Sequence, residues 1–334
     1  MKAVSLMAPG EAKVIEVPQP KIATGELLLR VEQVGLCGTD LNSFRGRNPL
    51  IAYPRVIGHE IAATVVQGSA AIPEGTRVAV SPYTSCGQCA ACRNQRENAC
   101  RYNQTLGVQR DGALTEWIAV PEAKVYPSSL SLRELCIVEP LTVGMHAVVR
   151  GRITSIDTVA VFGCGGVGLG AVAGAAFRGA RTIAIDMDDT KLETARAAGA
   201  AEVIHSSRED FRARLRQLTD GHGPDVVIEA IGLQETFRAA VEEVAFTGRV
   251  VYIGYAKEPV AYETKLFVQK ELDIIGSRNA LPADFIEVIS MLEAGRFPVE
   301  RAVSAVVPVQ EAPAILAKWS ETPSAFTKIM VQVS

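Results

Sequence analysis

The sequence has almost no excess charge of either sign. Lys and Arg together number 34 against 37 Asp and Glu, so the formal net charge is −3 at pH 7. The sequence pI is near 5.9, and no basic cluster is present. The charge therefore gives no argument for a nucleic acid or an anionic membrane surface as a partner, and we expect neither.

Continuous apolar segments of targeting or membrane length are also missing. Residues 1–17 mix polar positions with an early Pro9, so we predict no secretory signal. The apolar segment 159–177 approaches the length of a membrane span, but its many glycines predict a strand, a turn and a helix. The sequence contains no internal repeats or low-complexity stretches. We expect a cytoplasmic location.

The chain length favours two domains, because 334 residues are too many for one ordinary core. Residues 1–144 hold short alternating strands between Pro and Gly turns, which predicts a mainly antiparallel β domain. Residues 145–285 alternate short apolar strands with helices, which predicts a parallel, doubly wound α/β sheet. Residues 286–334 end in a strand, and we expect this segment to return to the first domain.

Four of the seven cysteines lie in one short loop with the spacing C-x2-C-x2-C-x7-C: Cys86, Cys89, Cys92 and Cys100. In a reducing compartment such a cluster favours a metal over disulfides. Zinc binds four thiolates tetrahedrally, and it would order a loop with little core of its own. Incidental thiols and an iron–sulfur cluster are alternatives. Four sulfurs leave no open position, so zinc in this lobe, about residues 84–102, is predicted to be structural.

A second constellation would leave a coordination position open. Cys37 lies in "GLCGTD", His59 and Glu60 in "GHE", and Glu139 in "EPLTVGMHA". Cys, His and one carboxylate give three protein ligands plus a water, which is the pattern of catalytic zinc. Each residue alone is weak evidence, because a lone His in a strand-like segment is more often structural. The prediction depends on whether the rest of the chain requires a Lewis acid.

A nucleotide-binding motif follows the predicted strand 158–162. Gly163-x-Gly165-x-x-Gly168 opens a helix of small residues, and the next strand ends at Asp186, 18 residues after Gly168. Strand, glycines, helix, strand and acid in this order predict a dinucleotide site rather than a packing turn. The phosphates would face the helix N-terminus. Asp186 would bind the ribose hydroxyls and repel a 2′-phosphate, so NAD is favoured over NADP.

These motifs, in this order and along the whole chain, resemble the zinc-dependent medium-chain dehydrogenase/reductase (alcohol dehydrogenase) family. "GHE", "EPLTVGMHA" and "GSRNALP" are most similar to its sorbitol (polyol) and sugar-acid dehydrogenase branch. The resemblance implies a GroES-like, mainly antiparallel β catalytic domain and a Rossmann NAD domain, with the active site in the cleft between them. It also implies a homo-oligomer, either a dimer or a tetramer.

The resemblance assigns roles at the zinc. Cys37, His59 and Glu60 would be ligands of the catalytic zinc, and Glu139 would either ligate it or hold its water. Thr39 would supply the hydroxyl of a proton relay, although a hydroxyl there can also simply form a turn. Many relatives carry His five residues after the zinc cysteine, but this chain has Asn42, which cannot exchange a proton near neutral pH. The outer end of the relay therefore stays open.

The resemblance also assigns cofactor and substrate residues. Arg278, Asn279 and Thr39 are expected at the substrate. The residues expected at the nucleotide are Gly163, Gly165, Gly166, Val167, Gly168, Asp186, Lys191, Gly254 and Ser277.

The segments that carry these substrate residues are polar, and only 6% of the chain is aromatic. A polar pocket suits a polyhydroxylated substrate. An arginine such as Arg278 suits an aldonate carboxylate, whereas Arg45 and Arg47 are more often simple surface charges.

The sequence therefore predicts a zinc- and NAD-dependent oxidoreductase that oxidises a secondary hydroxyl of a polyol, sugar or sugar acid to a ketone, with one catalytic and one structural Zn²⁺. The enzymatic alternatives are an L-threonine 3-dehydrogenase or another zinc alcohol dehydrogenase. The non-enzymatic alternatives are a zinc-lobed redox sensor, an NAD-binding regulator and a zinc-lobed nucleic-acid-binding module. The charge balance disfavours the last of these.

Overall fold

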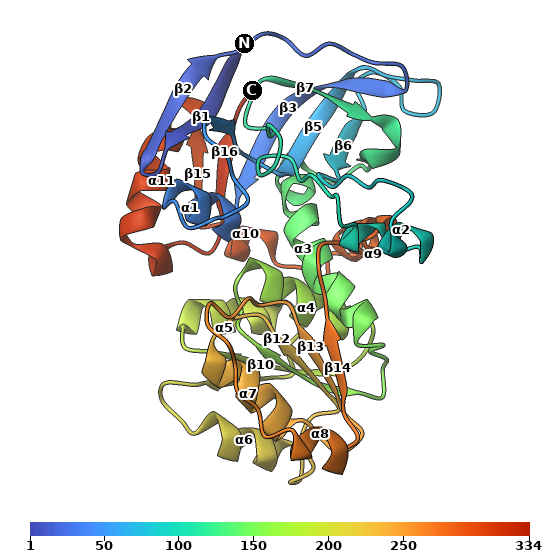
Figure 1. The fold of residues 1–334 in the computed structure, drawn as a ribbon, viewed down its shortest axis with the longest axis vertical. Helices are drawn as coiled ribbons and strands as arrows, with labels where there is room; N and C mark the ends of the chain where they lie inside the picture. The colour runs from blue at the N-terminus through green and yellow to red at the C-terminus, as the bar shows by residue number, and fades with distance from the viewer. The chain divides into compact units, whose positions relative to one another are not determined.

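The structure is a computed structural model that describes residues 1–334 (Figure 1). The chain forms two compact units. The first comprises Met1–Glu139, Leu281–Ile289 and Val299–Ser334, and the second comprises Pro140–Ala280 and Ser290–Pro298. Helices α3 (Leu132–Arg150) and α9 (Pro282–Glu293) contribute residues to both units. No helix has the length and apolar character needed to cross a membrane.

The first unit is built on two sheets. The smaller one has three antiparallel strands in the order β2 (Glu11–Glu16), β1 (Lys2–Ala8), β4 (Arg55–Val56). The larger one has seven strands in the order β15 (Ala305–Pro308), β16 (Ile329–Gln332), β3 (Glu26–Leu36), β5 (Glu60–Gln67), β6 (Arg77–Val80), β8 (Val125–Pro127), with β7 (Trp117–Pro121) also paired to β3. Only the β15–β16 pair is parallel.

The core of the first unit lies between these sheets and the elements packed on them. Leu29, Val31, Ile61 and Val78 are almost completely buried on strands rich in β-branched residues, which suit a pleated surface. Figure 1 shows β16, near the red end of the chain, beside blue β3, and the two strands pair antiparallel. The last strand is therefore an inner strand of this sheet.

The helices of the first unit are short. They are α1 (Gly38–Phe44), α2 (Ala90–Arg93), α10 (Val299–Ala302) and α11 (Ala312–Glu321), with 3-10 turns η1 (Glu97–Ala99), η2 (Glu122–Lys124), η3 (Val309–Glu311) and η4 (Pro323–Ala325).

The second unit is a six-stranded parallel sheet. Its strand order is β11 (Glu202–His205), β10 (Arg181–Asp186), β9 (Thr158–Phe162), β12 (Val226–Glu229), β13 (Arg249–Tyr252), β14 (Asp273–Gly276). Numbered along the chain this is 3-2-1-4-5-6, the order of the doubly wound dinucleotide-binding fold. The inner strands β9 and β12 are buried along almost their whole length, as expected when helices cover both faces. The predicted fold class is confirmed.

The helices that connect these strands are α4 (Gly166–Phe177), α5 (Asp189–Ala197), α6 (Phe211–Leu218), α7 (Gln234–Glu243) and α8 (Lys265–Gln269). The core contains Phe162, Ile183, Leu215 and Val227.

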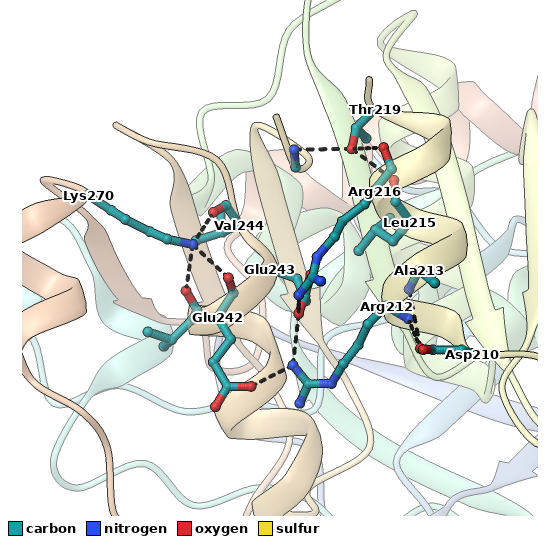
Figure 2. A network of polar contacts seen from close by, with 12 residues as sticks. Asp210, Arg212, Ala213, Leu215, Arg216, Thr219, Glu242, Glu243, Val244 and Lys270 are labelled. Atoms are coloured by element: carbon teal, nitrogen blue, oxygen red, sulfur yellow. Dashed lines mark hydrogen bonds and ion pairs between the residues drawn. The ribbon is translucent and has the colours of Figure 1, made fainter. Parts of the chain in front are cut away.

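An ionic network joins α6 to α7. Figure 2 shows Arg212 and Arg216 of α6 reaching the carboxylate of Glu243, with N···O distances of 2.8 Å from each Arg to Oε1. Arg212 also binds Glu242, and Lys270 donates to the main-chain oxygen of Glu242 at 2.7 Å, near the end of α7. The side chain of Glu243 is only 2% exposed, so its charge is paired inside the protein.

We predict that Glu243→Gln lowers the stability of the second unit. The change keeps the shape of the side chain but leaves two guanidinium groups facing a neutral amide, at a cost of about 2 kcal/mol. Differential scanning calorimetry measures the effect as a lower transition temperature. Glu242→Gln is the matched control, because that carboxylate is partly exposed and its loss costs less than about 1 kcal/mol. Equal shifts for the two variants would contradict the assignment.

Candidate active site

Cys37 caps the N-terminus of α1 in the first unit. Its Sγ accepts from the main-chain N–H of Thr39 at 3.1 Å, and Oδ2 of Asp40 accepts from the N–H of Cys37 at 3.0 Å. This reciprocal pair is a capping box, in which the two side chains satisfy N–H groups that the helix leaves unpaired. The local sequence "CGTD" thus fixes the position of the thiol. Thr39 lies half-buried in the first turn, and Asn42 is exposed on the same helix.

His59 lies just before β5 and faces both Cys37 and Asp40. Its Nε2 is 3.0 Å from the Cys37 Sγ, and its Nδ1 is 3.7 Å from Oδ1 of Asp40. Neither His59 Nδ1 nor Asp40 Oδ1 has a hydrogen-bond partner, although both are buried. An imidazole with one nitrogen toward a ligand thiol and the other toward a carboxylate has the orientation of a zinc ligand. Burial would lower the pKa of His59, but Cys37 and Asp40 raise it well above its ordinary value.

Asp40 is a functional candidate that the sequence interpretation missed. Its side chain is completely buried, and burial raises its pKa while His59 opposes the rise. Its position in "CGTD", three residues after the cysteine, was an available signal, because a helical cap brings these two residues together.

Glu60 follows His59 at the start of β5 and is paired with a lysine. Lys328, just before β16, places its Nζ 2.5 and 2.6 Å from the two carboxylate oxygens. Both side chains are at most 5% exposed. Gly35 on the neighbouring strand makes room for this pair, because a Cβ there would overlap Oε2 of Glu60. Burial opposes the charge on Lys328, but Glu60 keeps its pKa above the ordinary value.

Glu139 on α3 accepts a hydrogen bond from the hydroxyl of Tyr83. Burial raises the pKa of Glu139 to about 7, and His59 partly offsets this rise. Its carboxylate lies within 4.8 Å of ligand atoms of His59 and Glu60.

These side chains fit a catalytic zinc. One group of potential ligands comprises Cys37, Asp40 and His59, a second comprises His59, Glu60 and Glu139, and His59 belongs to both. Sulfur, imidazole nitrogen and carboxylate oxygen are the donor types that zinc binds. Burial raises the pKa of both Asp40 and Glu139, so a nearby cation would stabilise their charged forms.

The four-cysteine lobe fits a second zinc. The Sγ of Cys89 is 3.6 Å from that of Cys92 and 3.8 Å from that of Cys100, and the Cys86–Cys92 distance is 4.0 Å. Four sulfurs at 2.3 Å from one zinc ion are about 3.8 Å apart. Main-chain N–H groups lower the pKa of Cys89 to about 6, while burial and the neighbouring thiols raise that of Cys92 to about 11. A divalent cation would let all four bind as thiolates.

The second unit has a glycine turn, between β9 and α4, at the carboxyl edge of its sheet. Gly163 follows β9 with φ +93°, and a Cβ on Gly168 would overlap the main-chain oxygen of Gly163. Gly165 caps α4 without a side-chain hydrogen bond, so the N–H groups of Gly166 and Val167 in the first turn have no side-chain acceptor from the cap. A helix N-terminus of this kind favours a phosphate.

Asp186 ends β10 next to this turn. Its Oδ2 accepts from the N–H of Cys164 at 2.7 Å, and its Oδ1 accepts from the N–H groups of Met187 and Asp188. These bonds hold the carboxylate at the sheet edge, where a ribose is expected. Lys191 lies in the first turn of α5.

Two further predicted cofactor residues lie at the same edge. Gly254 follows β13, where a Cβ would overlap Oε2 of Glu229, and Ser277 follows β14. The Ser277 Oγ and the Glu229 Oε2 are both buried without a hydrogen-bond partner. Buried polar atoms without a partner, on the same sheet edge as the glycine turn, fit a bound nucleotide.

The predicted substrate residues fall into different parts of the chain. Arg278 and Asn279 are near the end of the second unit's longest segment, and Asn279 has φ +52°. Thr39 is near the metal-ligand candidates of the first unit. Arg45 is tied to α11, where its Nε donates to Ser320 Oγ at 3.0 Å. This contact gives Arg45 a structural role, and Arg47 is exposed.

Comparisons with known proteins agree with this arrangement. The family profile "Alcohol dehydrogenase GroES-like domain" matches residues 23–130, and "Zinc-binding dehydrogenase" matches residues 166–294. L-galactonate-5-dehydrogenase of Escherichia coli (strain K12) is 34% identical over 289 residues, which cover 85% of this chain and 84% of the relative. Sorbitol dehydrogenase of Bacillus subtilis (strain 168) is 33% identical over 287 residues, which cover 83% and 81%.

The chain belongs to the zinc-dependent medium-chain alcohol dehydrogenase family. Within the family it belongs to the sugar and polyol branch. A solved structure of this dehydrogenase fold, the rspB alcohol dehydrogenase of Escherichia coli CFT073 complexed with NADH, has a TM-score of 0.90 and 28% identity, and covers 100% of this chain and 99% of that chain. The family resemblance predicted from the sequence is confirmed.

We predict that the dehydrogenase holds two zinc ions per chain and that Cys37→Ser holds one. The change removes the Cys37 thiolate from the candidate ligands around His59 and leaves the four-cysteine lobe intact. Elemental analysis of protein freed of loosely bound metal gives the count. Cys164→Ala is the matched control, because its thiol lies in neither cluster, and it should keep both ions. A Cys37→Ser protein with two zinc ions would show that Cys37 is not a ligand.

Proposed function

We propose that this dehydrogenase oxidises a secondary hydroxyl of a polyol, sugar or sugar acid to a ketone, with NAD⁺ as the hydride acceptor. One observation carries the proposal: a group with the donor types of a catalytic zinc, which includes His59, occurs in the same chain as a glycine turn next to Asp186 whose helix has no side-chain cap. Such a metal needs a hydroxyl or carbonyl substrate, and such a turn needs a dinucleotide.

In this proposal Cys37, His59 and either Glu60 or Glu139 hold the zinc, which when bound supplies a Lewis acid that lowers the pKa of a substrate hydroxyl. Asp40 orients His59 by facing its Nδ1. Lys328 balances the charge of Glu60. Thr39, whose side chain lies on the same turn of α1 as Asp40, accepts the substrate proton and passes it toward solvent. Asn42 cannot take part in that transfer by exchanging a proton.

At the nucleotide, the proposal assigns the pyrophosphate to the first turn of α4 and the adenosine ribose to Asp186 and Lys191. Gly254 and Ser277 contact the cofactor farther along the sheet edge. Asp186 sets the preference for NAD⁺, because its carboxylate is held at the ribose position and would repel a 2′-phosphate. Solved relatives complexed with NADH and bound to NADP support a nicotinamide cofactor, and they differ in the form that is bound.

The polyhydroxylated substrate class rests on the relatives and on the polar side chains assigned to the substrate. L-galactonate and sorbitol dehydrogenases are sugar-acid and polyol enzymes by name. Because Arg45 is bound to Ser320, Arg278 is the arginine that the proposal assigns to a substrate carboxylate or hydroxyl. Substrate hydroxyls that pair with such groups are discriminated strongly, because their absence leaves protein polar groups unpaired.

We predict that Asp186→Ala narrows the preference for NAD⁺ over NADP⁺ by about tenfold, or ~1.4 kcal/mol. The change removes the charge that repels a 2′-phosphate. The ratio of kcat/KM for the two cofactors measures the effect. Glu193→Ala on α5 is the matched control, because it removes an exposed carboxylate that is not expected at the ribose. An unchanged ratio in Asp186→Ala would mean that another residue sets the cofactor preference.

We predict NADH formation from hexitols, pentitols or aldonates, and little from simple alcohols. The absorbance of NADH with zinc-loaded protein measures the reaction, and L-threonine is included in the panel. Cys37→Ser is the negative control, because it should bind NAD⁺ but give no turnover. Turnover on L-threonine alone would replace the polyol assignment with threonine dehydrogenase. Turnover by Cys37→Ser equal to that of the natural sequence would overturn the zinc mechanism.

A further inference from the structure

Tyr83 is a buried residue that neither the sequence motifs nor the mechanism above uses. Its side chain is 6% exposed, and its hydroxyl donates to Oε1 of Glu139. A phenolic hydroxyl carries its hydrogen near neutral pH, so it can donate to this carboxylate. Tyr83 lies three residues before Cys86, the first cysteine of the lobe.

We propose that Tyr83 is a positioning residue of the active site: its hydroxyl holds the Glu139 carboxylate beside His59, and the four-cysteine lobe holds Tyr83 in place. The proposal deepens the function proposed above and rests on it for its kinetic consequences. The structural part of the proposal, in which the lobe orients the Glu139 carboxylate through Tyr83, does not depend on which substrate is used.

Glu139 needs such an anchor because it lies close to another carboxylate. Its ligand oxygen is within 4.8 Å of that of Glu60, and two carboxylates this close repel each other. Lys328 holds both oxygens of Glu60. A hydrogen bond from Tyr83 to Oε1 of Glu139 restricts rotation of that carboxylate, so the donor decides how Glu139 faces His59. Carboxylates and other groups that orient metal ligands affect metal affinity and activity by about 10- to 100-fold.

Hydrogen bonds hold the main chain on both sides of Tyr83. On one side, the N–H of Ser81 donates to the main-chain oxygen of Lys124 at 2.8 Å, and the N–H of Leu106 donates to that of Pro82 at 3.1 Å. On the other side, the N–H of Thr84 donates to Oδ1 of Asn103 at 3.0 Å.

Asn103 connects the segment around Tyr83 to the four cysteines. Its N–H donates to the main-chain oxygen of Cys100 at 3.2 Å, and its side-chain Nδ2 donates to the Oγ1 of Thr105 at 2.9 Å. The N–H of Cys86 donates to Sγ of Cys100 at 3.4 Å. The segment that carries Tyr83 is therefore linked to the lobe in two ways. It continues directly into Cys86, and Thr84 is joined to Cys100 through Asn103. A metal on the four sulfurs would lock this arrangement.

Tyr83→Phe is the direct test, because it removes one hydroxyl and keeps the buried ring. We expect kcat to fall about 10- to 100-fold while the KM for NAD⁺ stays unchanged, since the nucleotide site is elsewhere in the chain. The second readout needs no substrate: Co²⁺ in place of the catalytic zinc should show altered visible absorption bands and faster loss to a chelator, while the lobe keeps its zinc. Tyr126→Phe is the matched control, because it also removes one tyrosine hydroxyl, from a ring that stacks on Phe285.

Asn103→Ala tests the link to the lobe without changing a thiol or Tyr83. The same spectral change in a weaker form, with the lobe zinc retained, is expected, and this variant keeps the test informative if Tyr83→Phe does not fold. Co²⁺ spectra and release rates of Tyr83→Phe identical to those of the natural sequence would overturn the proposal, even if the protein is an active dehydrogenase. If no dehydrogenase activity is found on any substrate, altered Co²⁺ spectra would still support the positioning role, and the proposed function alone would fail.

Discussion

The first unit is organised around a concentration of buried negative charge. Asp40, Glu60 and Glu139 all approach His59, and each is at most 6% exposed. Removing carboxylates from water is costly unless cations or hydrogen-bond donors compensate them. The surrounding residues supply part of this compensation: the capping N–H of Cys37 serves Asp40, Lys328 serves Glu60 and Tyr83 serves Glu139. A divalent metal is the compensation that the donor atoms still fit.

The second unit has a different constraint: its main chain is tightly packed at the edge of the sheet where a phosphate would fit. Its parallel sheet brings the ends of β9, β10, β12, β13 and β14 to one edge. Side chains are removed at Gly163, Gly168 and Gly254, where a Cβ would strike neighbouring atoms. Glu229 shows how tightly this edge is packed: its Oε1 accepts from the N–H groups of Ile231 and Gly232, while its Oε2 has no partner. Close packing and buried polar atoms thus occur together at the edge where a ligand is expected.

Features that are local in sequence were predictable, and features that depend on distant pairing were not. The four-cysteine spacing and the strand–glycine–helix order each lie within one short segment of the chain. The parallel sheet could be predicted from the alternation of strands and helices. Lys328 was not predicted, because it meets Glu60 from 268 residues away through the pairing of β16 with β3. Tyr83 was hidden for a similar reason, since its partner is 56 residues away on a helix. Asp40 was the exception: its contact with Cys37 follows from a local cap within "CGTD", so the motif already contained it, although its contact with His59 depends on packing.

The position of Lys328 also determines when the site acquires its charge balance during synthesis. Cys37, His59 and Glu60 are synthesised well before Lys328, which lies just before β16 and whose ammonium group pairs with Glu60. Until β16 pairs with β3, Glu60 lacks Lys328 beside it, and residues 33–36 of β3 lack one strand partner. Pairing of β16 with β3 therefore both completes this part of the sheet and brings the charge of Lys328 to Glu60.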